Sequence, residues 1–88
     1  MLYYLCTAYE TRTQKPLTEP EVVSIVPPMS GCTKFLNQQI VNTKFQSLIE
    51  QRSEEDRAYR NKFVAIDWYV RSVQITKEEA DERQAVEV

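Results

Sequence analysis

Residues 53–75 read Ser-Glu-Glu-Asp-Arg-Ala-Tyr-Arg-Asn-Lys-Phe-Val-Ala-Ile-Asp-Trp-Tyr-Val-Arg-Ser-Val-Gln-Ile. Apolar side chains recur in this stretch at alternating steps of four and three residues: Tyr59, Phe63, Ile66, Val70 and Val73. This spacing stacks side chains on one face of a helix. Ser53 precedes three acidic residues, a pattern typical of a helix N-terminus. The stretch therefore predicts a helix over about residues 54–73.

A strand is the competing interpretation for the later part of this stretch, residues 64–75. These residues are dense in Val, Ile, Trp and Tyr, which favour the pleated surface of a sheet. Strict alternation, however, would place Arg71 and Val73 on the same buried face. The helical spacing is therefore the interpretation that we favour.

The chain before this stretch predicts two strands and a helix. Residues 2–11 are rich in aromatic and β-compatible side chains, and residues 21–26 are rich in β-branched ones, with a long polar loop between them. Ser30 to Thr33 resembles a helix start, so we place a helix at about residues 32–51. Its apolar residues gather on two different sides of the helix: Phe35, Leu36 and Ile40 on one, and Val41, Phe45, Leu48 and Ile49 on the other. This helix is therefore expected either to kink near Asn42 or to be buried on two sides, which suggests a contact between subunits.

The C-terminal segment predicts a short acidic helix. Thr76 followed by Glu79 forms a capping box, and Ala80 lies where an apolar side chain would pack on the residue before the cap. We place this helix at about residues 77–86, with residues 84–88 as a frayed tail. The whole chain, residues 1–88, is then expected to form a single compact α+β domain: two N-terminal strands packed on two main helices, plus the short helix.

The composition argues against catalysis, cofactors and metals. The chain contains no histidine, the commonest general base and metal ligand, and Gly31 is its single glycine, which excludes a glycine-rich phosphate loop. Cys32 at a predicted helix N-terminus is the best enzymatic feature, but we interpret Cys6 and Cys32 as reduced, partly buried thiols. The acidic clusters are interpreted as first-turn acids of helices. We expect a non-enzymatic protein without a cofactor.

The chain carries no pattern of export or membrane insertion. Its first residues lack the basic start of a signal peptide, and no run approaches the roughly 20 apolar residues of a membrane span. We therefore expect a soluble, cytoplasmic protein.

A second face of the predicted helix supplies the candidate binding site. At about 100° per residue, six residues gather opposite the apolar stripe: Arg57, Arg60, Val64, Trp68, Arg71 and Ile75. They could cover the N-terminal strands, with the arginine stems along the rim. Alternatively they form an interface, since Trp and Arg are enriched in interface hot spots. This favours a protein-interaction module, an inhibitor or adaptor that binds another protein or a second copy as a homodimer.

Nucleic-acid binding is the second functional hypothesis. The basic side chains for phosphate contacts would be Lys44, Arg52, Arg57, Arg60 and Arg71. Trp68 or a strand tyrosine (Tyr3, Tyr4 or Tyr9) would stack on bases. The acidic C-terminal segment counts against this hypothesis, because it repels phosphates.

Overall fold

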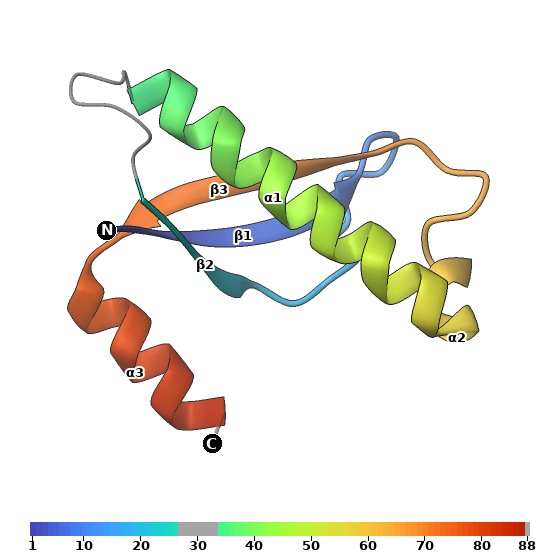
Figure 1. Ribbon diagram of the computed structural model, residues 1–88. Coiled ribbons are helices and arrows are strands. Elements are labelled where there is room, and N and C mark those ends of the chain that lie inside the picture. The colour runs from blue at the N-terminus through green and yellow to red at the C-terminus, as the bar shows by residue number, and fades with distance from the viewer. Residues whose placement is uncertain (27–33, 88) are drawn as a thin grey trace.

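The computed structural model describes residues 1–26 and 34–87, with side chains as far as Arg83. The elements follow the chain in the order β1 (Leu2–Glu10), β2 (Glu21–Ile25), α1 (Lys34–Glu55), α2 (Arg57–Asn61), β3 (Trp68–Ile75) and α3 (Lys77–Glu87). The three strands form one antiparallel sheet in the order β2-β1-β3. Figure 1 shows α1 lying across this sheet. The predicted α+β class is confirmed.

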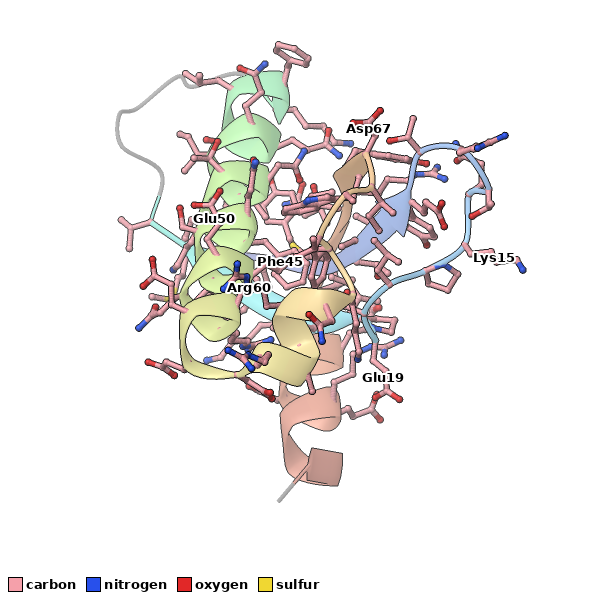
Figure 2. The ribbon with its side chains drawn as sticks, turned by 90° about the vertical axis from the view of Figure 1, so that its right-hand side faces the viewer. Lys15, Glu19, Phe45, Glu50, Arg60 and Asp67 are labelled. Carbon is pink, nitrogen blue, oxygen red and sulfur yellow. The ribbon has the colours of Figure 1, made fainter. Side chains whose placement is uncertain are left out.

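The main core lies between α1 and one face of the sheet. It is built from Tyr4, Cys6 and Ala8 of β1, Val23 and Ile25 of β2, and Val41, Phe45 and Ile49 of α1. The buried residues of α1 follow one another at four-residue steps, which keeps them on one stripe. Figure 2 shows Phe45 pointing from α1 toward the strands.

The expected kink or two-sided burial of the first helix is wrong. α1 is one continuous helix, and its buried residues share a single stripe. Phe35 and Leu36, which supplied the second apolar phase, are 68% and 43% exposed. Residues at these positions precede the stretch of α1 that lies over the centre of the core, so the sheet does not cover them.

Polar side chains of α1 form hydrogen bonds with both edge strands of the sheet, β2 and β3. Lys44 Nζ donates to the Ser24 carbonyl oxygen on β2 at 2.7 Å, and Gln38 Nε2 donates to the Ser72 carbonyl oxygen on β3 at 2.7 Å. Ser72 Oγ also donates to Asn42 Oδ1 at 2.6 Å. These bonds satisfy edge groups that would otherwise offer a template for pairing with another strand.

The helix predicted over residues 54–73 is wrong in its start and in most of its length. Ser53 does not begin a helix; it lies inside α1, where its Oγ donates to the Ile49 carbonyl oxygen at 2.8 Å. The cap is Asp56, whose Oδ1 accepts from the amides of Ala58 and Tyr59 at 3.0 and 3.3 Å. The helix that follows, α2, ends at Asn61.

Residues 68–75 form a strand, as the competing interpretation proposed. Ala65 adopts φ 63°, in the left-handed region, and this residue turns the chain out of the helical path. The Thr11 amide then donates to the Asp67 carbonyl oxygen at 3.0 Å, and β3 pairs with β1 along its full length. Pairing with a distant strand outweighs the local helical spacing.

The strands β1 and β2 and the helix α3 confirm their predictions. In the capping box of α3, the Glu79 amide donates to Thr76 Oγ1 at 3.2 Å. The predicted helix start around Ser30 and the candidate thiol Cys32 lie outside the described residues. Among the described helices, none combines the length and apolar content that a bilayer crossing requires.

Candidate interaction surface

The face of the sheet that points away from α1 is its outer face. Side chains alternate between the two faces of a strand, and directly paired residues share a face. Because Tyr4, Cys6 and Ala8 are buried under α1, their neighbours in β1 point the other way. The register assigns to the outer face Tyr3, Leu5, Thr7 and Tyr9 of β1, Val22 and Ser24 of β2, and Tyr69, Arg71, Val73 and Ile75 of β3.

Helix α3 covers one part of the outer face. Ala80 is fully buried (0% exposed), yet it does not belong to the core cluster under α1. α3 contacts β1 and β2, and Figure 1 shows it on the other side of the sheet from α1. Tyr3, Leu5 and Val22 are correspondingly half-buried. This half of the outer face packs against the chain's own helix.

The other half is formed by Tyr9, Tyr69, Arg71 and Val73, and we call it the bare half of the outer face; Arg71 and Val73 are exposed there, whereas Tyr9 and Tyr69 are half-buried. The rings of Tyr9 and Tyr69, which are direct partners across β1 and β3, stack with centroids 5.9 Å apart at 26°. The Arg71 guanidinium lies 5.7 Å from the Tyr9 ring centroid, within the range of a cation–π contact. Val73 is 64% exposed. An aromatic pair, a guanidinium and an aliphatic side chain thus share one surface.

The tyrosine pair is held in place at its outer end. Tyr69 Oη donates to Gln14 Oε1, and Gln14 adopts φ 61° in the loop between β1 and β2. The same loop is bound to β1 through the Glu10 and Lys15 backbone at 2.9 Å. The ring of Tyr69 is therefore oriented by a loop contact as well as by stacking. A surface with fixed rings loses little side-chain entropy when a partner binds.

The six residues predicted as one binding face do not come together. Arg57 and Arg60 are exposed on α2, which packs on α1, and Figure 2 shows Arg60 beside α1. Val64, 51% exposed, follows α2. Only Arg71 and Ile75 share the outer face, because the predicted helix that would have aligned all six is absent.

Trp68 supports the core instead of the outer face. Its ring makes an edge contact with Phe63 at 5.0 Å between centroids, and both side chains pack against the core cluster. Trp68 thus belongs to strand β3 itself and does not, as the sequence interpretation had it, cover the strands from a helix. The aromatic residues of the bare half are Tyr9 and Tyr69; the sequence analysis named Tyr9 only as a possible base-stacking residue and did not select Tyr69. The alternation of Tyr69, Arg71, Val73 and Ile75 was the signal that could have found them.

The basic side chains of the nucleic-acid hypothesis are dispersed over the molecule. Lys44 is bonded to β2, and Arg52 pairs with Glu21 through both oxygens, at 2.5 and 2.7 Å. The hydrogen bond to Glu21 is the main cause that raises the pKa of Arg52. Tyr4 is buried in the core. Of the set named for that hypothesis, Tyr9 and Arg71 lie together.

The described part of the chain contains the thiol of Cys6, which is buried. Burial, with a smaller contribution from the charge of Glu21, raises the pKa of the free Cys6 thiol to about 12. A thiol in this state is a poor nucleophile at neutral pH. Within residues 1–26 and 34–87, cysteines and carboxylates do not gather into a group that could hold a metal ion.

Comparison with known proteins finds no matching family model, no matching curated protein and no matching solved structure.

Proposed function

We propose that this chain is a non-catalytic protein-interaction module that binds a protein partner through the bare half of its outer face. The observation that carries the proposal is the grouping of Tyr9, Tyr69, Arg71 and Val73 on the sheet half that α3 leaves uncovered. Aromatic and arginine side chains are the residues most enriched in interface hot spots. By occupying its partner's surface, the module acts as an inhibitor or adaptor.

The packing of the molecule favours this face over α2. Arg57 and Arg60 of α2 are exposed, but the rings of that region, Tyr59 and Phe63, pack against the core cluster. Arg71, in contrast, lies on a stacked ring pair and next to exposed Val73. A partner that covers the bare half therefore removes apolar and aromatic area from water, which is the main driving force of association.

A matched pair of glutamate substitutions tests the proposal. Val73→Glu places a charge on the bare half, and Val64→Glu, at another exposed valine (51%), places the same charge elsewhere. Tagged wild-type chain and both variants are used to capture proteins from a lysate of the cells that naturally make the chain. We expect proteins retained by the wild type and Val64→Glu to be lost from Val73→Glu. Identical retained sets for all three chains would contradict the proposal.

Nucleic-acid binding is a second candidate, because Tyr9 and Arg71 form a stacking platform with an adjacent cation. The acidic side chains of α3, on the same side of the sheet, oppose phosphate binding. A labelled 20-residue oligo-dT at low salt tests it. Binding that falls steeply with salt and is lost in Tyr9→Ala would favour this candidate over the first.

A further inference from the structure

We infer that two copies of this chain pair through the free edges of their β3 strands and join their sheets into one continuous sheet. The inference goes beyond the proposed function, because it concerns the edge of the sheet and leaves the outer face open. β3 ends the strand order β2-β1-β3, so one side of β3 faces no strand among the described residues. A free edge presents backbone donors and acceptors that can pair with a further strand.

The register identifies which backbone groups lie on the free edge of β3. The Thr11 amide donates to the Asp67 carbonyl oxygen at 3.0 Å, one step beyond the last pair of the β1–β3 ladder. Hydrogen-bonded pairs alternate with non-hydrogen-bonded pairs along an antiparallel ladder. The Ser72 carbonyl oxygen fits this alternation, because it accepts from a side chain of α1. The backbone groups that point away from β1 therefore belong to every second residue: Trp68, Val70, Ser72 and Gln74.

Helix α1 occupies this edge at Ser72 and leaves the beginning of the edge open. Gln38 Nε2 donates to the Ser72 carbonyl oxygen at 2.7 Å, and Asn42 Oδ1 accepts from Ser72 Oγ at 2.6 Å. Within the described chain, the outward backbone groups of Trp68 and Val70 form no hydrogen bond with α1. A strand can therefore pair with these two residues without displacing a bond of α1.

One antiparallel register pairs Trp68 of each copy with Val70 of the other, around a twofold axis beside Tyr69. Each of these pairs exchanges two backbone hydrogen bonds. An axis farther along β3, at Val70 or Arg71, would draw on the Ser72 carbonyl oxygen, which is bonded to α1. An axis at Arg71 would also place two arginines opposite each other, which is destabilising. The edge therefore favours the axis at Tyr69.

The charges on either side of this axis argue for a second copy as the partner. Asp67 lies two residues before Tyr69 and Arg71 lies two residues after it, and both charged side chains are exposed. Figure 2 shows Asp67 at the start of β3, away from α1. Around an axis at Tyr69, Asp67 of each copy lies opposite Arg71 of the other. Opposite charges directly across an antiparallel pair are stabilising, and the twofold axis forms this contact twice.

The aromatic and aliphatic side chains at the axis suit the same register. Tyr69 lies opposite Tyr69 of the second copy, in a non-hydrogen-bonded pair whose Cα atoms approach to about 4.5 Å. The stack of Tyr9 and Tyr69, with centroids 5.9 Å apart, then continues across the axis. On the inner face, Trp68 and Val70 are half-buried and pack against the core cluster, so their contact joins the two cores. Arg71 lies over the Tyr9 ring in the single chain, and because it is exposed it can turn toward the edge.

Pairing at this edge places the bare halves of the two copies side by side. Directly paired residues share a face of the sheet, so the two outer faces become one. A partner of the proposed function then meets a surface of twice the width.

Charge reversal, and its repair in a mixture, tests the inference. Asp67→Lys places a lysine opposite Arg71 of the second copy, and Arg71→Glu places a glutamate opposite Asp67, so each variant repels its own copy. In an equimolar mixture, both contacts across the axis become attractive again. Asp81→Lys and Arg57→Glu make the same changes at exposed positions of α3 and α2 and serve as controls. Sedimentation velocity over a range of chain concentrations measures association, and circular dichroism checks that each variant is folded.

We expect the wild type and both controls to form dimers as the chain concentration rises. Asp67→Lys and Arg71→Glu should each dimerise at least about tenfold more weakly, and their mixture should form dimers at the same concentration as the wild type. A wild type that stays monomeric up to its solubility limit would overturn the inference. Dimers that resist both reversals, or a mixture that stays monomeric, would overturn it as well.

Oxidative cross-linking checks the register. Tyr69→Cys brings two thiols together at the axis, within the Cα separation of about 4.4–6.8 Å that a disulfide requires. Val73→Cys is the control, because its two thiols would lie about 26 Å apart at roughly 3.3 Å per residue. The wild type, oxidised in parallel, accounts for Cys6 and Cys32. We expect a covalent dimer above the wild-type level from Tyr69→Cys alone, and equal cross-linking of both variants would overturn this register.

Val73→Glu separates self-association from the proposed function. Val73 lies outside the paired residues 68–70, so this variant should dimerise as the wild type does while it loses captured proteins. A chain that stays monomeric and still loses captured proteins in Val73→Glu would keep the proposed function and overturn the inference. A chain that dimerises as expected but captures the same proteins with and without Val73→Glu would do the reverse.

Discussion

At the scale of single residues, the core buries a tyrosine hydroxyl, that of Tyr4, without a hydrogen-bond partner among the described residues. Tyr4 is 1% exposed. Burying an unpaired polar group costs about 1–3 kcal/mol. The ring, in contrast, is one of the largest side chains of the core. Tyr4 is thus retained for its volume, at the expense of its hydroxyl.

Tyr4→Phe should therefore leave the free energy of unfolding unchanged or raise it by about 1 kcal/mol. Urea denaturation measures the change. Tyr4→Ala is the control, and its loss of about 3–5 kcal/mol would show that the ring is needed. A loss of more than about 1 kcal/mol in Tyr4→Phe would mean that the hydroxyl is paired in the folded chain.

Cys6 gives the fold a pH dependence on the alkaline side. The thiol ionises near its ordinary pKa of 9.0 in the unfolded chain, whereas burial raises its pKa to about 12 in the fold. Between these values the unfolded chain has lost a proton that the folded chain keeps, so the free energy of unfolding decreases as the pH rises. The contribution is fully present below pH 9.0 and is lost progressively toward pH 12.

Comparison with Cys6→Ala isolates this contribution from the other groups that titrate in the range. From pH 9 to pH 10, we expect the stability difference between the wild type and the variant to move against the wild type by up to about 1.4 kcal/mol. Urea midpoints at pH 8, 9 and 10 give the measurement. A difference that stays constant over the three pH values would show that Cys6 ionises as readily in the fold as in the unfolded chain.

At the scale of elements, the two sites that resemble helix caps can be told apart by mutation. Asp56 caps α2, and Asp56→Ala should lower the free energy of unfolding by about 1 kcal/mol. Ser53 lies inside α1, where alanine has the higher helix propensity, so Ser53→Ala should change stability by less than about 0.5 kcal/mol. Thermal unfolding followed by circular dichroism measures both. An equal loss of unfolding free energy in the two variants would mean that Ser53 also acts as a helix cap.

The elements differ in how far the sequence alone could predict them. The strands β1 and β2 follow from local composition, and α3 follows from its capping box. Each of these patterns is recognisable from a few neighbouring residues. β3 depends on pairing with β1, some 60 residues earlier; its β-branched and aromatic residues favour a strand locally, but only this pairing decides against the competing helical spacing. Arg71 counts against a strand only where its face of the sheet is buried. Arg71 and Val73 do share a face, but it is the outer one.

The residues of the candidate site also differ in whether local sequence or long-range strand pairing determines their position. Arg71 was selected for the chemistry of its guanidinium; it is exposed on the outer face, and its part in binding stays a prediction. Tyr9 and Tyr69 were missed as a pair, because only the antiparallel register places them opposite each other. Trp68 was selected for its residue type, yet the pleat points it toward the core. Residue type was readable from the sequence, whereas the direction of each side chain required the register.

At the scale of the whole molecule, the chain is less compact than its length predicts. Its radius of gyration is 13.8 Å, against about 12 Å for a compact domain of this length. It exposes 6484 Å², against about 5,400 Å² for a compact protein of its mass. One side of a standard interface covers about 800 Å², so a partner of that kind would cover about an eighth of the exposed area.

The attachment of α3 decides how much of the outer face is open. Ala80 is the buried side chain of α3 among those described, and it lies outside the core cluster under α1. A charge at this position should lift α3 from the sheet, because burying an unpaired carboxylate is costly. The core under α1 should persist. Ala80→Glu is thus expected to uncover Tyr3, Leu5 and Val22 without unfolding the chain.

Small-angle scattering and a dye that binds exposed apolar surface measure this change. Ala58→Glu, at an exposed alanine of α2, is the matched control. We expect Ala80→Glu to have a radius of gyration above 13.8 Å and stronger dye fluorescence than the control, with its strand signal retained. Scattering and dye binding equal to those of Ala58→Glu would mean that contacts other than Ala80 hold α3 on the sheet.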